Sequence, residues 1–145
     1  VLYFSNEQDC SVSGYRLDTA TGTLSLFQTV TTLPEGYTER NTCSQIQVST
    51  SGRFLYAPNR GHDSIACFSV DTATGELTAT GRVASEARPN AFSLGPQDKF
   101  LYSAGQDSGR MATFSVNQDT GELIPLEVYP LGNTPSWVSI IELQG

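Results

Sequence analysis

The sequence predicts an all-β protein, on three observations. Turn-forming residues are abundant, with 13 Gly and 7 Pro among 145 residues, and β-favouring Thr occurs throughout. Apolar and polar residues alternate with period two over short segments, whereas no stretch has the 3.6-residue periodicity of an amphipathic helix. The same short pattern of residues also recurs three times along the chain.

The repeated pattern defines the structural unit. Each copy has a Leu-Tyr pair, then an alternating segment ending in Asp or Asn, and then a Thr-Gly turn. The Leu-Tyr pairs are 53 and 46 residues apart, and the Thr-Gly pairs repeat both offsets. The copies start at Leu2-Tyr3, Leu55-Tyr56 and Leu101-Tyr102, and their turns fall at Thr21-Gly22, Thr74-Gly75 and Thr120-Gly121.

Each unit is predicted to hold four strands, named A to D here. In the middle unit they fall at about 44–49, 54–58, 65–70 and 76–83, with Gly-bearing turns between A and B and between C and D. A four-stranded unit of roughly 45 residues is typical of a β-propeller blade.

The chain holds about three blades' worth of four-stranded antiparallel sheets, offset by one strand. We expect strands B to D of a first blade at about 1–33, a second blade at about 43–84 and a third at about 89–130. A terminal strand A is expected at about 135–143. Because a propeller closes with about four to eight blades, residues 1–145 are predicted to form a partial propeller, possibly completed by another copy or fragment.

Several loops resemble those of a known family. Gly52–Tyr56 followed by Asn59–Ile65, then Gln106–Ser108, and finally Thr134–Val138 are similar to the C-terminal portion of the lactonase-type seven-bladed β-propellers. This resemblance implies hydrolysis of a sugar lactone, as in 6-phosphogluconolactonase, and so a hydrolase of carbohydrate metabolism. The same family includes lactone-forming enzymes such as carboxymuconate cyclase, and the fold alone does not separate the two.

Strand directions place the loops that follow strands B and D at one end of the propeller. Four of the eight basic residues fall in these loops, namely Arg40, Arg60, Arg88 and Arg110. On a chain of net charge −7, this grouping predicts local attraction for a small anionic sugar lactone.

Candidate site residues follow from these loops and from the resemblance. Arg60 and His62 are the catalytic candidates, for stabilising developing negative charge and for proton transfer respectively. Two alternatives remain open: Arg60 could instead tie adjacent blades together, and His62 could be an ordinary loop residue. The substrate-binding candidates are Arg40, Gln45, Gln47, Arg88, Asn90, Gln106 and Asp107.

Three positions depart from the pattern that the resemblance implies. Relatives commonly carry an acid early in strand A and a His two residues later, where this chain has Gln45 and Gln47. Their Pro-Arg pair stands here as Pro89-Asn90. Because an amide cannot exchange a proton usefully, a catalytically lapsed propeller that binds a sugar acid or acts as a scaffold is the alternative function. A carboxymuconate cyclase-like activity is a third.

Charge and composition exclude other classes. An acidic chain with eight basic residues is not expected to bind nucleic acid, and no apolar run is long enough to cross a membrane. The three cysteines and one histidine match no metal-ligand spacing, so we expect no metal and no cofactor. Buried free thiols point to a reducing cytoplasm.

Overall fold

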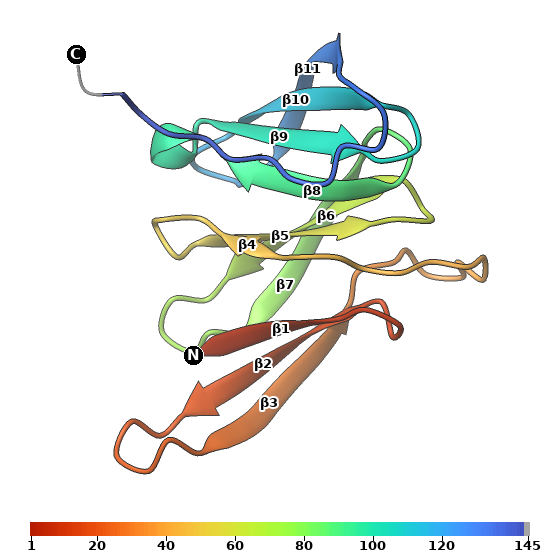
Figure 1. Cartoon of the computed structure of the whole chain (residues 1–145). Coiled ribbons are helices and arrows are strands. Elements are labelled where there is room, and N and C mark those ends of the chain that lie inside the picture. The colour runs from red at the N-terminus through yellow and green to blue at the C-terminus, as the bar shows by residue number, and fades with distance from the viewer. Residues whose placement is uncertain (144–145) are drawn as a thin grey trace.

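Three antiparallel sheets stand in a row in the computed structural model, which describes residues 1–143 (Figure 1). The first sheet has three strands and the others have four, each in chain order, and a short 3-10 turn at Pro96–Asp98 joins β8 to β9. The strands are β1 Leu2–Asn6, β2 Ser11–Leu17, β3 Leu24–Thr31, β4 Gln47–Val48, β5 Phe54–Asn59, β6 Ser64–Val70, β7 Leu77–Ala84, β8 Pro89–Leu94, β9 Phe100–Gly105, β10 Arg110–Val116 and β11 Leu123–Pro130. The predicted all-β partial propeller is confirmed.

A tyrosine hydroxyl joins each blade to the next. Tyr3 of the first sheet donates to the Gly75 carbonyl of the second at 2.5 Å, and Tyr56 of the second donates to Gly121 of the third at 2.9 Å. The recurring tyrosine of one unit thus contacts the glycine turn of the next unit in both seams.

The receiving turn requires glycine for two reasons. Gly121 has φ +73°, which side-chain-bearing residues rarely adopt. A Cβ at this position would also lie 2.3 Å from Cδ1 of Phe54, so the aromatic ring packs where a side chain would stand. The turn is further fixed by Asn117, whose Oδ1 accepts the Asp119 and Thr120 amides.

The core lies in the two seams between the sheets. One cluster, between the first two sheets, contains Val12, Leu55 and Phe68, while a second cluster, between the last two, contains Tyr56 and Phe114. Neighbouring residues of β5 thus face opposite seams, and every residue of that strand is buried. The middle blade is stabilised from both sides by apolar burial.

The outer faces of the first and third sheets lack such cover. In β4–β7 only Val48 is an exposed large hydrophobic residue among the described residues. On these outer faces the first sheet exposes four of them and the third also exposes four, which are Phe4, Leu17, Leu24 and Leu26, and Phe100, Ile124, Leu126 and Tyr129. These two faces have the apolar character of a blade seam without a neighbouring blade.

Strand A of the middle blade is shorter than predicted, because β4 spans only Gln47–Val48. Gln47 pairs with Tyr56, whereas Cys43 bridges Asn59, so the register shifts by one residue between the two pairs. The third blade has the same shift, between Pro89 and Ala91. This bulge leaves residues 44–46 outside the ladder.

The terminal strand A expected at 135–143 is not formed, since none of these residues is in a strand. Figure 1 draws the segment after β11 as coil. A strand is held by a ladder of hydrogen bonds to a neighbouring strand. No described residue pairs with this segment in such a ladder, so the alternating pattern alone does not produce a strand.

Replacing Tyr56 by Phe tests the hydrogen bond between blades. We expect Tyr56→Phe to lower the free energy of unfolding by about 1–2 kcal/mol, because the Gly121 carbonyl loses its partner in a buried seam. Urea denaturation followed by circular dichroism measures the change. The matched control is Tyr102→Phe, since Tyr102 makes no side-chain hydrogen bond to the described residues. Equal losses in both variants would contradict the role assigned to the bond.

Candidate functional site

Three arginines from the predicted loops line one polar pocket. Arg40, Arg60 and Arg88 meet around a volume of about 260 Å³, whose lining is completed by Asn41, Thr42, Gly61 and Asp107. Residues 40–42 precede strand A of the middle blade, residues 60–61 follow its strand B, and the other two lie in loops of the third blade. The pocket therefore lies where loops of neighbouring blades converge.

Arg60 contacts all three blades. Its Nη2 donates to the Cys43 carbonyl at 2.7 Å and to the Glu7 carboxylate, and its Nη1 donates to Oδ1 of Asn90 at 3.2 Å. Only 16% of the Arg60 side chain is exposed, against 59% for Glu7. The guanidinium is thus held in one orientation at the edge of the pocket, and it also joins the blades.

Asn41 fixes the loop that carries Arg60. Its Oδ1 accepts the backbone amides of Gly61 at 2.7 Å and His62 at 3.0 Å, while its Nδ2 donates to Oδ1 of Asn59 at 3.1 Å. Gly61 is required here because a Cβ would lie 2.1 Å from the carbonyl oxygen of Arg40. This network keeps the two pocket loops in close contact.

The remaining charges leave the pocket cationic. Arg88 lies 3.9 Å from the Asp107 carboxylate, and both side chains are at least half exposed, so solvent weakens this pair. Arg40 is exposed and forms no ion pair with any described residue. Three guanidinium groups against the carboxylates of Asp107 and Glu7 leave one net positive charge, which favours an anionic ligand.

His62 lies beside the pocket rather than in its lining. Its Nδ1 is 2.7 Å from the Ser64 hydroxyl, and its ring makes an edge contact with Tyr37, with centroids 4.9 Å apart. The adjacent Asp63 accepts the Arg88 amide at 2.8 Å. In this structure His62 therefore contacts neighbouring loop residues, and its catalytic role stays a prediction.

Gln45 and Gln47 join two blades. Both Nε2 atoms donate to the Phe92 carbonyl, at 2.7 and 3.2 Å, and Oε1 of Gln47 accepts the Leu94 amide at 2.8 Å. Neither residue lines the arginine pocket. In this structure, the two amides hold the start of the middle blade against β8.

Gln106 and Arg110 lie outside the lining of the arginine pocket. Gln106 lines a neighbouring pocket of about 390 Å³ with Ser108 and Asn133, and Asp107 borders both pockets. Arg110, the fourth arginine of the predicted face, pairs with Glu86 at 3.4 Å instead.

Glu7 was missed in the sequence analysis, although the repeat could have revealed it. It stands five residues after Leu2, as Arg60 stands five after Leu55 and Gln106 five after Leu101. The three residues occupy the same place in successive blades, at the start of the loop after strand B. An acid and a base at matching places in neighbouring blades predict the ion pair that the structure contains.

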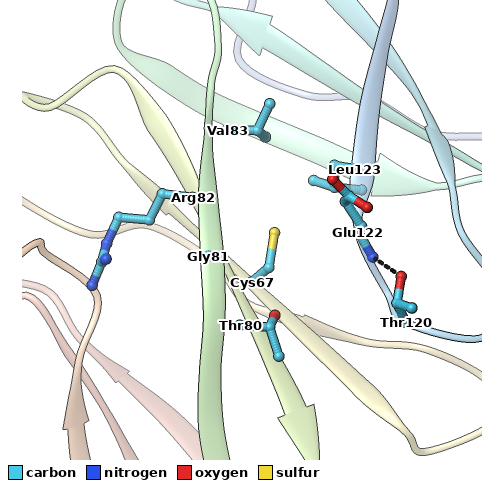
Figure 2. Close-up of a pocket in the computed structure, with 8 residues that line it drawn as sticks. All are labelled: Cys67, Thr80, Gly81, Arg82, Val83, Thr120, Glu122 and Leu123. Carbon is cyan, nitrogen blue, oxygen red and sulfur yellow. Dashed lines mark hydrogen bonds between the residues drawn. The ribbon is translucent and has the colours of Figure 1, made fainter.

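A larger pocket of about 520 Å³ lies between β7 and the turn before β11, and Figure 2 shows its lining. It contains none of the predicted site residues. Burial raises the pKa of the Cys67 thiol to about 12, so this group stays protonated at neutral pH. Arg82 points away and donates through Nε to the Thr32 carbonyl at 2.6 Å. Without converging charges, this pocket is a weaker candidate than the arginine pocket.

Comparison with known proteins gives the family. The family described as "Lactonase, 7-bladed beta-propeller" matches residues 1–140. The chain belongs to this family. It is 37% identical to a 6-phosphogluconolactonase of Pectobacterium carotovorum over 141 residues, which cover 97% of this chain and 42% of the relative. The chain thus spans about two fifths of the length of this relative.

Two solved structures superpose closely on this chain. A protein of Lactobacillus plantarum matches with a TM-score of 0.89 and 26% identity, over 93% of this chain and 40% of that one. A periplasmic gluconolactonase of Pseudomonas aeruginosa matches with a TM-score of 0.86 and 27% identity, over 92% and 37%. Both confirm the propeller fold and its partial coverage.

Residues 1–143 contain neither a membrane-spanning helix nor a metal-binding cluster. No helix is long and apolar enough to span a bilayer. No group of three or more His, Cys, Asp and Glu side chains is placed to hold a metal ion.

Replacing Asn41 tests how the pocket is supported. We expect Asn41→Ala to lower the free energy of unfolding by about 2 kcal/mol, because it leaves the Gly61 and His62 amides without their acceptor. Chemical denaturation measures the loss, and exposed Asn133→Ala is the control for an asparagine outside this network. Equal stability of the two variants would show that water replaces the side chain at no cost.

Proposed function

We propose that the complete propeller hydrolyses a phosphorylated sugar lactone of the 6-phosphogluconolactone type. The observation that carries this proposal is the pocket in which Arg40, Arg60 and Arg88 converge on an otherwise acidic chain. Family membership and the similarity to a 6-phosphogluconolactonase support the same reaction class.

The proposed chemistry divides the arginines by their surroundings. Arg40 and Arg88 are exposed and bind the phosphate, a role that suits the planar guanidinium fork. Arg60 is held by three partners and donates to the lactone carbonyl oxygen as negative charge develops there.

Water supplies the nucleophile in this proposal. The Asp107 carboxylate takes a proton from a water molecule as that water attacks the carbonyl carbon. The ring C–O bond then breaks, and the released alkoxide takes up the proton from Asp107. The product is the open sugar acid. No step requires a metal ion.

The arginine pocket forms only part of the proposed site. Its volume of about 260 Å³ is below the roughly 300–1,000 Å³ usual for ligand pockets. We propose that further blades of this repeat, from the rest of a longer chain or from a second copy, pack on the two uncovered outer sheets and complete it. The exposed apolar residues of those sheets support this arrangement. A solution mass of 15.6 kDa for residues 1–145, equal to one chain, would contradict completion by a second copy and leave completion by the rest of a longer chain.

A second candidate is a propeller that binds a sugar acid without turnover. It is favoured by the absence of a relative-like acid or His in strand A, where Gln45 and Gln47 are engaged with Phe92. A cytoplasmic location is proposed for either function, on the support of the three free cysteines.

Hydrolysis of 6-phosphogluconolactone, corrected for spontaneous opening, tests the first proposal. We expect Arg60→Ala to lower kcat/KM roughly 100-fold or more, because a positioned donor to the developing oxyanion is lost. Arg60→Lys keeps the charge without the fork and should lose less. Arg16→Ala is the matched control, since Arg16 lies over Phe27 in the first sheet, outside the pocket.

Isothermal titration with 6-phosphogluconate separates the two candidates. Binding that weakens in Arg88→Ala, together with no turnover in folded protein, would support the binding propeller over the hydrolase. Turnover unaffected by Arg60→Ala would contradict the proposed role of Arg60. Turnover of a muconate-type diacid in preference to the sugar lactone would indicate the cyclase activity instead.

A further inference from the structure

Two of the three cysteines meet in the seam between the first two sheets. Cys10 ends the loop between β1 and β2, and Cys43 lies just before β4, so they come from different blades. Both are buried and free. Cys67 belongs instead to the cluster between the second and third sheets.

The two thiols share one set of neighbours. Asn41 donates through Nδ2 to the Cys10 sulfur at 3.1 Å and to Oδ1 of Asn59 at 3.1 Å, and the Cys43 sulfur lies 3.6 Å from the same Oδ1. The Thr32 hydroxyl is 2.9 Å from the Cys10 carbonyl and 3.2 Å from the Cys43 sulfur. The backbone is drawn together as well, because the Cys43 amide donates to the Glu7 carbonyl at 3.0 Å.

The thiols also act on each other directly. Burial is the main cause that raises the pKa of the Cys43 thiol, to about 11, and Cys10 adds to this rise through its charge and through contact between the thiols. No other cysteine contributes to the raised pKa of the Cys67 thiol. Cys10 and Cys43 therefore form a thiol pair, and Cys67 serves as a buried internal control.

We propose that Cys10 and Cys43 are a site of reversible oxidation, at which a disulfide forms across the seam between the first two blades. The oxidant is a low-molecular-weight disulfide such as oxidised glutathione. This proposal stands on the seam geometry and is independent of the proposed lactonase activity.

The reaction proceeds by two exchanges. Cys10 is 6% exposed, whereas Cys43 is fully buried. The Cys10 thiolate therefore makes the first attack, on one sulfur of the small disulfide. The S–S bond breaks, and the first small thiolate takes up the proton that Cys10 released. The Cys43 thiolate then attacks the Cys10 sulfur and expels the second small thiolate, which takes the proton of Cys43. The cysteines lose two electrons, and one small disulfide becomes two thiols.

The bond would restrain two groups that hold Arg60. Glu7, three residues before Cys10, pairs with its guanidinium, and the Cys43 carbonyl accepts from its Nη2. Cross-linking residues 10 and 43 therefore fixes both partners to one another. It also limits the unfolded chain, so oxidation should raise Tm, and dithiothreitol should reverse the rise.

Thiol counting and peptide mapping test the proposal on the chain of residues 1–145. The reduced protein is incubated with oxidised glutathione at mildly alkaline pH, unfolded, alkylated and digested with trypsin. We expect the titratable thiols to fall from three to one. The digest should contain peptide 1–16 linked to peptide 41–53 and lighter by two hydrogens, with Cys67 alkylated in peptide 61–82.

Two variants complete the test. Cys67→Ser should give the same linked peptides, with no thiol left, whereas Cys10→Ser should form no internal disulfide. The proposal is overturned if Cys10 carries glutathione while Cys43 stays alkylatable. It is equally overturned if three thiols persist, or if Cys67 enters the linkage as often as Cys43. The unmodified chain and Cys67→Ser decide the matter even where Cys10→Ser does not fold.

Discussion

The fold depends on strands that bury both faces, and a tyrosine hydrogen bond recurs in each seam. The Tyr56 hydroxyl reaches the Gly121 carbonyl of the next blade while the adjacent Leu55 packs toward the previous one. A blade of this kind is stable only between two neighbours, because either face alone leaves apolar surface in water. The middle sheet meets this condition, whereas the first and third sheets each meet it on one side.

The repeat predicted the architecture well, because its recurring residues make the contacts between blades. The recurring tyrosine of one unit donates to the recurring glycine of the next unit. The repeat therefore indicates contacts between blades as well as the strands within a blade. Strand A was predicted less well. Alternation favoured strands at 44–49 and 135–143, but a bulge shortens the first, and the second has no described ladder partner. In both segments, strand formation depends on hydrogen-bonded pairing with a neighbouring strand rather than on the alternation of residues.

The site was predicted by position better than by contact. Topology placed the loop arginines at one end, and three of them line one pocket. Side-chain partners come from other blades and cannot be read along a strand. Gln45 and Gln47, for example, hold the Phe92 carbonyl in the structure, a contact that the sequence did not indicate. Their role in substrate binding stays a prediction.

Asn90 is best understood through Arg60. An arginine at position 90 would place a second guanidinium beside Arg60, and like charges in a half-buried site repel. Here Asn90 accepts from Nη1 of Arg60 at 3.2 Å, and Glu7 balances its charge from the first blade. Asn90 therefore helps to hold Arg60 in place. Because its partners belong to three blades, the orientation of this guanidinium depends on both seams, and the same contacts that stabilise the fold set the geometry of the pocket.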